Sequence, residues 1–276
     1  MVLPNTALAD KAREIRRIAL ETALKAGKGH VPPAFSWADI GVVLFYGGVL
    51  RVRPEHPDWP DRDRLILSKG HACLTLYAIL ADLGFFPSSE LHAFCGDGAL
   101  LPGHPDALIP GVDVISGSLG HGLGVAAGLA LAARTDDRPH RVFTILGDGE
   151  CHEGAVWEAA MFAGHHKLSN MVAILDNNRL SATNYTDQVL TLGPVVDRFT
   201  SFGWDAVSVD GHDLEALGDA LRPARLDRQD KPLAIIAETV KGKGVDFMEN
   251  SPRWHHQLPK GPQVDAALTQ LRDPAY

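Results

Sequence analysis

Two polar segments in the middle of the chain, Gly147-Asp148-Gly149 and Asp176-Asn177-Asn178, each follow directly after an apolar run. Asp148 offers a carboxylate and Asn178 an amide oxygen, and both are hard ligands of the type that magnesium prefers. The glycines Gly147 and Gly149 let a phosphate approach the backbone closely and expose its N–H groups. Because magnesium commonly bridges a few protein oxygens to a polyphosphate, the two segments together indicate a half-site for a magnesium-bound diphosphate.

Gly-Asp-Gly and Asn-Asn are both common turn sequences, so each segment could also be an ordinary turn. The elements around them decide whether they form a binding site. The apolar runs Val142 to Leu146 and Met171 to Leu175 predict two strands, and residues 153–168 between them predict a helix. A strand, a helix and a strand within about forty residues form a βαβ unit, whose strands are parallel and end at the same edge of the sheet. Ligands bind at that edge in open α/β folds, so the site is the preferred interpretation.

The rest of the chain continues this alternation. We expect an α/β fold, a parallel sheet with helices on both faces, in one domain over residues 1–276 with an extended tail from about 245 to 276. Near the N-terminus we expect a loop at Pro32-Pro33 and a capping-box-like helix start at Ser36-Trp37-Ala38-Asp39. The other expected elements are helices at 8–26, 72–83, 195–202 and 213–221, a helix after the glycine-rich turn that begins at 116, and strands at 65–68, 204–209 and 232–240.

The composition excludes several classes of protein. Of the 276 residues, 45% are hydrophobic and 22% charged, as in an ordinary globular protein, and the formal net charge of −8 without a basic stripe argues against nucleic acid as a partner. Cys73, Cys95 and Cys151 are too few and scattered for a disulfide framework or a zinc site. The N-terminus lacks the apolar core of a signal peptide, and the longest apolar stretch, 123–133, is too short for a bilayer. We therefore expect a cytoplasmic protein without membrane contact.

The histidines show an unusual pattern. Six of the 13 directly follow a glycine, where chance would give about one. Glycine before histidine favours loops that turn sharply and hold an imidazole at a strand end, and several imidazoles in one pocket suit proton transfer and hydrogen bonds to polyhydroxy substrates. A surface or turn histidine is the alternative for each, and we keep it for His165, in a helix, and His212, in a late turn. The six are His30, His71, His104, His121, His165 and His212.

Small residues recur at intervals of four at Gly120, Gly124, Gly128 and Ala132. On a helix they would form a stripe almost without side chains, against which another backbone can pack closely. The stripe would fit either flat against the sheet or against an equivalent or partner helix at a subunit contact, and the second is the preferred interpretation.

The two polar segments and the helix between them resemble a known family. Gly147-Asp148-Gly149 followed by Asn177-Asn178 resembles the thiamine diphosphate motif, and the sequence EGAVWEAAMFAGHHKL between them resembles transketolase. In that family the aspartate, the asparagine and a carbonyl two residues later bind the metal, which implies Asp148, Asn178 and the Leu180 carbonyl as ligands. The implied cofactors are thiamine diphosphate, which is the electron sink, and Mg²⁺, or Ca²⁺ or Mn²⁺ in its place.

Four histidine segments match places where transketolases have active-site histidines. By that resemblance His30, His71, His104 and His255 surround the reactive carbon and the hydroxyls of the sugar. The matching segments are Gly29-His30, Ser68-Lys69-Gly70-His71, Pro102-Gly103-His104-Pro105 and Arg253-Trp254-His255, and Lys241–Val245 and Phe247–Asn250 resemble the family as well.

Two further matches concern the cofactor and the subunit contact. The turn at residues 116–120 resembles the family's turn that touches the cofactor through its backbone, which implies Gly117 and Leu119 at the cofactor. Glu153 and Glu158 match family carboxylates near the dimer contact, and we place Glu153 among the cofactor-binding residues. A solvated helix face is the alternative for both glutamates.

The resemblance also implies a missing half. Thiamine enzymes need a second domain that binds the pyrimidine ring and supplies a glutamate to its N1′, and single-chain transketolases are more than twice as long as this chain. We therefore expect the N-terminal subunit of a split transketolase, which forms a heterotetramer with a separate C-terminal subunit that carries the pyrimidine-binding domain. Together they would transfer a two-carbon ketol unit from a ketose phosphate to an aldose phosphate, and the partner would hold most of the sugar phosphate.

Two alternatives stay open. The nearer one is a subunit of another thiamine diphosphate enzyme, either the α component of a 2-oxoacid dehydrogenase or a relative of deoxyxylulose phosphate synthase. The other is a non-catalytic module that binds the cofactor or only assembles with a partner, against which the retained histidines argue. The Lys-Gly-Lys-Gly and Trp-His segments favour transketolase, and the donor and acceptor sugars are left open.

Overall fold

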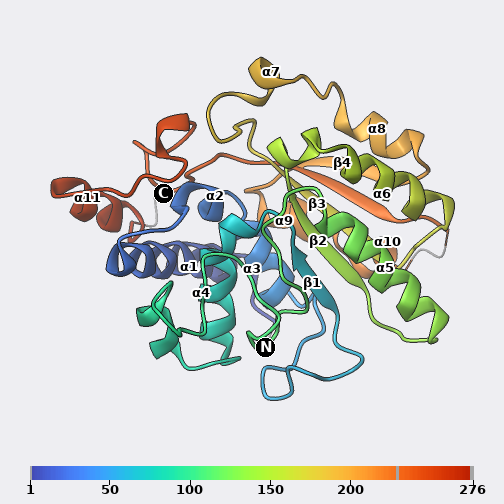
Figure 1. The fold of residues 1–276 in the computed structure, drawn as a ribbon, viewed down its shortest axis with the longest axis horizontal. Coiled ribbons are helices and arrows are strands. Elements are labelled where there is room, and N and C mark those ends of the chain that lie inside the picture. The colour runs from blue at the N-terminus through green and yellow to red at the C-terminus, as the bar shows by residue number, and fades with distance from the viewer. Residues whose placement is uncertain (1, 228–229, 274–276) are drawn as a thin grey trace.

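A five-stranded parallel sheet forms the centre of the chain in the computed structural model, which describes residues 2–227 and 230–273 (Figure 1). The strand order is β1-β2-β3-β5-β4, and every neighbouring pair is parallel. The strands are β1 (Arg64–Leu67), β2 (Val142–Gly147), β3 (Met171–Asn177), β4 (Asp205–Asp210) and β5 (Leu233–Glu238). The predicted parallel α/β fold is confirmed.

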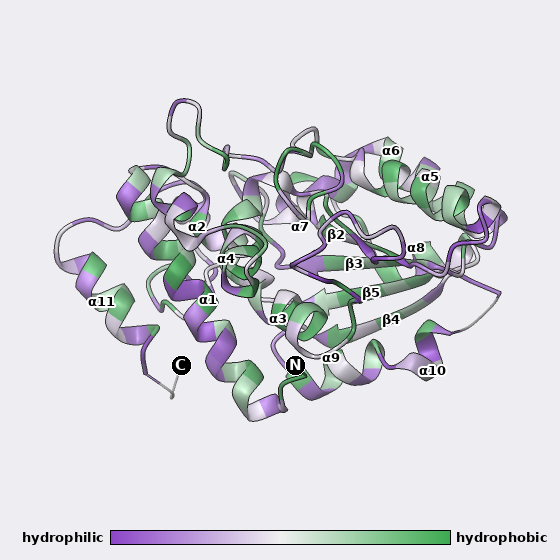
Figure 2. Ribbon diagram, turned by 90° about the horizontal axis from the view of Figure 1, so that it is seen from below, coloured by the Kyte–Doolittle hydropathy of each residue, from purple (hydrophilic) through white to green (hydrophobic). Residues whose placement is uncertain are grey.

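Helices cover both faces of the sheet. Figure 2 shows α5 and α6 on one side of the strands and α9 and α10 on the other. The helices are α1 (Asn5–Ala26), α2 (Val31–Ser36), α3 (Ala38–Tyr46), α4 (Cys73–Leu83), α5 (Gly122–Thr135), α6 (Gly154–His165), α7 (Thr186–Val189), α8 (Val195–Ser201), α9 (Leu214–Ala220), α10 (Pro223–Leu226) and α11 (Pro262–Gln270). Short 3₁₀ turns lie at Gly70–Ala72, Ser88–Ala93, Gly149–His152 and Pro252–Trp254.

Each strand contributes to two hydrophobic cores because successive side chains point to opposite faces. In β2, Phe143 and Ile145 pack into the core that contains α1, α3 and α4, whereas Val142 and Leu146 pack into the core under α5 and α6. All six residues of β2 are buried, so both faces of the strand are covered, and Thr144 is its only polar side chain. Burial of one such side chain stabilises the fold by about 1.5–3 kcal/mol.

The segment at the N-terminal side of the site differs from the prediction. Pro32 and Pro33 do not form a loop but lie in the first turn of α2, where the missing N–H groups would have no partner in the helix. The expected capping box is also absent, because Ser36 ends α2 and donates its hydroxyl to Pro33 and Asp176 instead of capping α3. The sequence pattern correctly placed the start of a helix near Ser36, but the Ser36 hydroxyl donates to the buried Asp176 carboxylate and does not cap that helix.

The tail contains more structure than expected. Residues 245–273 include α11, which the sequence pattern did not predict, and Ala267 and Leu271 pack into the core that contains α1. Val245 and Met248 are fully buried in the same core. None of the helices in the described part of the chain combines the length and the apolar character that a membrane crossing needs.

The register of the central strands positions the site. Gly147 of β2 pairs with Asp176 of β3, and Asn177 of β3 pairs with Glu238 of β5. The three strands therefore end at one edge, and the residues that follow them, from Asp148, Asn178 and Thr239 onward, come together although about ninety residues separate the first from the last.

Candidate functional site

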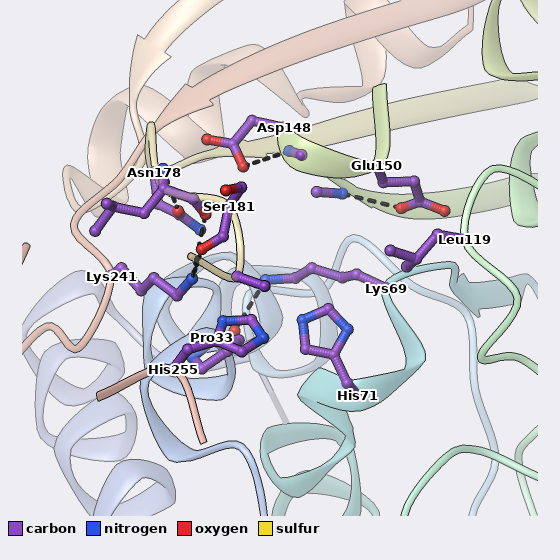
Figure 3. Close-up of a pocket in the computed structure, with 14 residues that line it drawn as sticks. Pro33, Lys69, His71, Leu119, Asp148, Glu150, Asn178, Ser181, Lys241 and His255 are labelled. Carbon is purple, nitrogen blue, oxygen red and sulfur yellow. Dashed lines mark hydrogen bonds between the residues drawn. The ribbon is translucent and has the colours of Figure 1, made fainter. Parts of the chain in front are cut away.

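A cavity of about 290 Å³ opens at the carboxyl edge of β2 and β3. Figure 3 shows Asp148 and Asn178 on one side of it and His71 and His255 on the other, with Lys69 nearby. The structure thus brings together residues from both predicted polar segments and two of the predicted histidines.

Asp148 carries an unsatisfied carboxylate oxygen into this cavity. Its Oδ1 accepts the Gly149 N–H at 2.7 Å, whereas Oδ2 is buried without a hydrogen-bond partner, and the residue is only 3% exposed. Burial, together with the nearby Asp176 carboxylate, raises the pKa of Asp148 to about 7. A bound cation would stabilise the ionised carboxylate by compensating its buried negative charge.

The loop after β3 brings the other two predicted ligands to the same cavity. Asn178 Oδ1 accepts the Leu180 N–H at 3.1 Å, and both residues line the cavity. Arg179 between them has a positive φ of 61°, which is unfavourable for a residue with a side chain. Strained backbone of this kind concentrates at functional turns, so the observation supports a role for the loop.

A buried ion pair that the sequence did not predict lies beneath the cavity. Lys69 and Asp176 are 2% and 0% exposed and form a salt bridge, and Ser36 and Thr239 also donate to the Asp176 carboxylate. Burial alone would raise the pKa of Asp176, but the Lys69 ammonium outweighs it and holds the pKa below its usual range. Lys69 belongs to the Ser68–His71 segment and Asp176 to the polar end of the second central strand, yet nothing in the sequence shows that they are buried together.

Lys241 brings a second buried cation to the site. Its Nζ donates to the carbonyls of Leu180 and Ser181 at 3.2 and 2.8 Å. Burial lowers the pKa of Lys241 to about 8, with the Asp148 carboxylate acting in the opposite direction. A lysine at this place gives the cavity positive charge close to Asp148, which suits a phosphorylated ligand.

Three of the four predicted histidines form one cluster. The ring centroids of His30, His71 and His255 are separated by 5.3, 5.4 and 5.4 Å, although the residues come from three distant segments. Burial lowers the pKa of all three, to about 2 for His71 and about 3 for His255, and nearby Lys69 or Lys241 contributes. The imidazoles are therefore neutral at neutral pH and each can both donate and accept a hydrogen bond.

His104 lies at the margin of this cluster and is exposed. It is close enough to His30 to contribute to the lowered pKa of that imidazole. Its ring packs against Gly117, where an added Cβ would lie 3.1 Å from the imidazole, and the φ of 140° at Gly117 is one that other residues rarely adopt. Leu119, two residues later, lines the cavity, whereas Gly117 and His104 do not.

Glu153 lies outside the cavity, and Glu150 takes the position inside. Glu153 is exposed and precedes α6, and Glu158 is exposed on that helix. Glu150 is buried and accepts hydrogen bonds from the N–H groups of Gly120 and Gly147, which ties the 116–120 turn to the end of β2. Its place in Gly-Asp-Gly-Glu, two residues after Asp148, was the available hint.

The stripe of small residues does not lie flat on the sheet. Gly120 precedes α5, and Gly124, Gly128 and Ala132 lie on its exposed face. An added Cβ at Gly128 would meet no atom within 4 Å. The face is free for another surface, so the alternative of packing against the sheet is excluded.

No group of three or more His, Cys, Asp or Glu residues in the described ranges has a geometry that could hold a metal. The predicted set of one carboxylate, one amide and one carbonyl is of a different type and suits a hard cation that keeps other ligands. The cavity therefore combines a hard-cation corner, buried lysines and neutral histidines.

Comparison with known proteins gives a consistent result. The family model described as "Transketolase, thiamine diphosphate binding domain" matches residues 8–271. The 6-deoxy-6-sulfo-D-fructose transketolase subunit SqwG of Clostridium sp. (strain MSTE9) is 39% identical over 265 residues, which is 96% of each chain. One of the subunits of apulose-4-phosphate transketolase from Phocaeicola vulgatus is 38% identical over 259 residues, 94% of this chain and 91% of that one.

Among solved structures, transketolase from Campylobacter jejuni superposes with a TM-score of 0.91 at 32% identity. The match covers 99% of this chain but 44% of the longer one, so this chain spans less than half of that transketolase. Fold, site geometry and family match agree with the resemblance seen in the sequence. The chain belongs to the transketolase family, and its fold is that of the family's thiamine diphosphate binding domain.

Proposed function

We propose that the chain is the diphosphate-binding subunit of a two-component transketolase, which transfers a two-carbon ketol unit from a ketose phosphate to an aldose phosphate. The observation that carries the proposal is the cavity that unites the buried, unpartnered Asp148 oxygen with a cluster of neutral histidines. The Asp148 side of the cavity suits a metal-bound diphosphate, and the histidine cluster suits a sugar. A non-catalytic assembly module would need neither.

The residues present fit a magnesium-bound thiamine diphosphate. Asp148, Asn178 and the Leu180 carbonyl would hold the metal, and the orphaned Asp148 Oδ2 supports this because a cation would complete its coordination. Gly149 and Lys241 both line the cavity and would face the diphosphate, Lys241 through its ammonium. When bound, thiamine diphosphate would supply the electron sink that takes up the electron pair released when the carbon–carbon bond beside the sugar carbonyl breaks.

The histidines would handle the sugar. His71 and His255 line the cavity, and His30 packs against both. Because burial keeps their imidazoles neutral, each offers one donor and one acceptor to a hydroxyl and can pass a proton to or from it. His104, at the exposed margin, would contact the part of the sugar that reaches toward solvent.

The remaining parts of the proposal concern assembly. Relatives of similar length carry the name of transketolase subunits, which supports a separate partner with the pyrimidine-binding domain. We place the complex in the cytoplasm as a heterotetramer, with residues 1–276 as one domain. The protomers would meet at the exposed face of Gly124, Gly128 and Ala132.

Reconstitution tests the function. The chain is mixed with a candidate partner of the complementary transketolase region, thiamine diphosphate and MgCl₂, and ketol transfer is followed with a ketose phosphate donor and an aldose phosphate acceptor. We expect activity only from the mixture, and Ca²⁺ or Mn²⁺ should substitute for Mg²⁺. Decarboxylation of a 2-oxoacid without ketol transfer would identify a different thiamine enzyme, and a silent mixture would favour a non-catalytic module.

A substitution tests the metal assignment in the same complex. Asp148→Ala removes the carboxylate whose Oδ2 has no partner, so we expect magnesium-dependent binding of thiamine diphosphate to be lost. Calorimetric titration of the cofactor with and without MgCl₂ measures this. Unchanged affinity in the variant would show that Asp148 is not a metal ligand.

A further inference from the structure

His212, to which the sequence analysis gave no role beyond a turn, connects three elements of the fold. It lies between β4 and α9, and its ring is 14% exposed. Its Nδ1 lies 2.6 Å from Asp39 Oδ2 in α3, and its Nε2 accepts the backbone N–H of Val240, just after β5, at 2.8 Å. Both ring nitrogens are thus engaged, on opposite sides, by residues that are far apart in the sequence.

These two contacts define the tautomer of the ring. A backbone N–H can only donate, so the Nε2 that faces Val240 carries no proton. The neutral imidazole then has its proton on Nδ1 and donates it to the Asp39 carboxylate. Burial alone would raise the pKa of Asp39, but the Arg16 guanidinium and the His212 hydrogen bond bring it well below its usual range, so the acceptor is charged.

His212 binds Val240, which is the middle one of three consecutive residues, 239–241, that all make hydrogen bonds to other elements. The Thr239 hydroxyl donates to Asp176, beneath the cavity. The Val240 N–H donates to His212, and the Lys241 ammonium reaches the carbonyls of the loop after β3. The turn after β5 is therefore attached on one side to the cavity and on the other side, through His212, to the helical layer that contains α1 and α3.

We propose that His212 is a positioning residue, which fixes the turn of Thr239–Lys241 and thereby directs the Lys241 ammonium into the cofactor cavity. Arg16 pairs with Asp39, Asp39 accepts the Nδ1 proton of the ring, and the ring accepts the Val240 N–H. His212 itself does not line the cavity. The inference rests on the proposed function only for what Lys241 does there, because the tautomer and the hydrogen bond belong to the chain alone.

The tautomer is tested on the unmodified chain. Two-dimensional ¹⁵N–¹H spectra that detect the imidazole nitrogens distinguish a protonated from an unprotonated ring nitrogen, and the His212 signals are assigned by their loss in His212→Gln. We expect an unprotonated Nε2 and a protonated Nδ1 at pH 7.5. A protonated Nε2 would overturn the proposal, since it could not accept the Val240 N–H.

Two variants then separate positioning from packing. Glutamine keeps one donor and one acceptor on a side chain of similar reach, whereas leucine keeps the volume and loses both. In His212→Leu we expect faster hydrogen exchange of the Val240 amide and an affinity for thiamine diphosphate with MgCl₂ that is about tenfold weaker, the effect of one lost hydrogen bond. In His212→Gln both quantities should stay within about threefold of wild type.

His165 provides the matched control, because it also follows a glycine and is exposed at the end of α6. Leucine and glutamine at His165 should leave the Val240 exchange rate and the cofactor affinity unchanged. Faster Val240 exchange in His212→Leu with wild-type cofactor affinity would refute the link to Lys241. If His212→Leu fails to fold, two results can still overturn the proposal. One is a protonated Nε2 in the wild-type chain, and the other is a His212→Gln chain in which Val240 exchange stays slow but the cofactor affinity falls by more than threefold. A wild-type chain that binds no thiamine diphosphate, alone or with its partner, would refute the proposed function instead.

Discussion

Asp148→Asn offers the sharpest test of the electrostatics of the site. The carboxyl group has a pKa of about 7 in the folded chain against 3.8 for the free side chain. The difference is about three units, and at about 1.4 kcal/mol per unit it corresponds to at most about 4 kcal/mol. The group is 3% exposed, so solvent screening reduces this value little. Asparagine has the same shape and cannot ionise, so it removes the cost of a buried charge.

The sign of the pH dependence follows from linkage. Because the folded pKa is raised, the folded chain binds more protons than the unfolded chain between pH 3.8 and about 7, and stability falls as pH rises through that window. Without metal, Asp148→Asn should therefore exceed wild type in stability by only about 1 kcal/mol near pH 4.5. At pH 8 it should be more stable than wild type by about 2–4 kcal/mol.

Urea unfolding followed by circular dichroism at pH 4.5, 6 and 8 measures this difference, and Asp97→Asn, at an exposed aspartate outside the cavity, is the control. With thiamine diphosphate and MgCl₂ the order should reverse, because only the wild-type carboxylate gains from the metal. A variant that is less stable than wild type at pH 8 without metal would refute the account of Asp148 as a destabilised, preformed ligand.

Three further predictions concern packing and charge. Lys69→Met leaves the Asp176 carboxylate buried without its cation and should destabilise the chain by about 3–5 kcal/mol in urea unfolding, and adding Asp176→Asn should recover part of that loss. Gly164→Ala should destabilise strongly, since its Cβ would lie 1.8 Å from a backbone oxygen, whereas Gly128→Ala, in open space, should stabilise the isolated chain by about 0.5–1 kcal/mol. Burial lowers the pKa of His255 to about 3, so its contribution to stability is lost as pH falls below 6.5. His255→Gln should reduce the stability lost between pH 7 and pH 5 by about 1 kcal/mol, after allowance for partial exposure.

These predictions can fail independently. A small effect of Lys69→Met would show that water reaches Asp176. A stable Gly164→Ala chain would show that the loop after α8 yields to the new methyl group. Equal pH profiles for wild type and His255→Gln would show that the imidazole is not desolvated.

The sequence predicted the parallel α/β fold and the place of Asp148 and Asn178 because both depend on local pattern. Apolar runs of strand length and glycine-rich ends are properties of short segments, and parallel pairing then requires the two ends to meet. The resemblance also indicated His30, His71 and His255, which the structure brings to within 5.4 Å of one another. The Gly-His pattern alone did not distinguish His30 and His71 from exposed His165, and it did not include His255, which follows Trp254.

Other features depend on which residues meet in three dimensions. The resemblance placed Glu153 among the cofactor-binding residues, but Glu153 is exposed, and it is the buried Glu150 that accepts the Gly120 N–H. Pro32 and Pro33 were expected to form a loop, yet the first turn of a helix tolerates them equally well. The energies of single hydrogen bonds and of first-turn prolines are small, so tertiary context decides between the alternatives.

The amino-acid sequence by itself determined the alternation of the five strands with the main helices, the two polar strand ends and the family, since each is encoded over a short stretch of the chain. The tertiary structure decided that Lys69 is buried against Asp176, that Lys241 turns toward Leu180, and that His212 links Asp39 to Val240. The physical reason is that burial and charge pairing are properties of contacts between distant residues. A lysine has the same chemistry in any sequence, but its pKa and its partner exist only once the sheet has brought its neighbours to one edge.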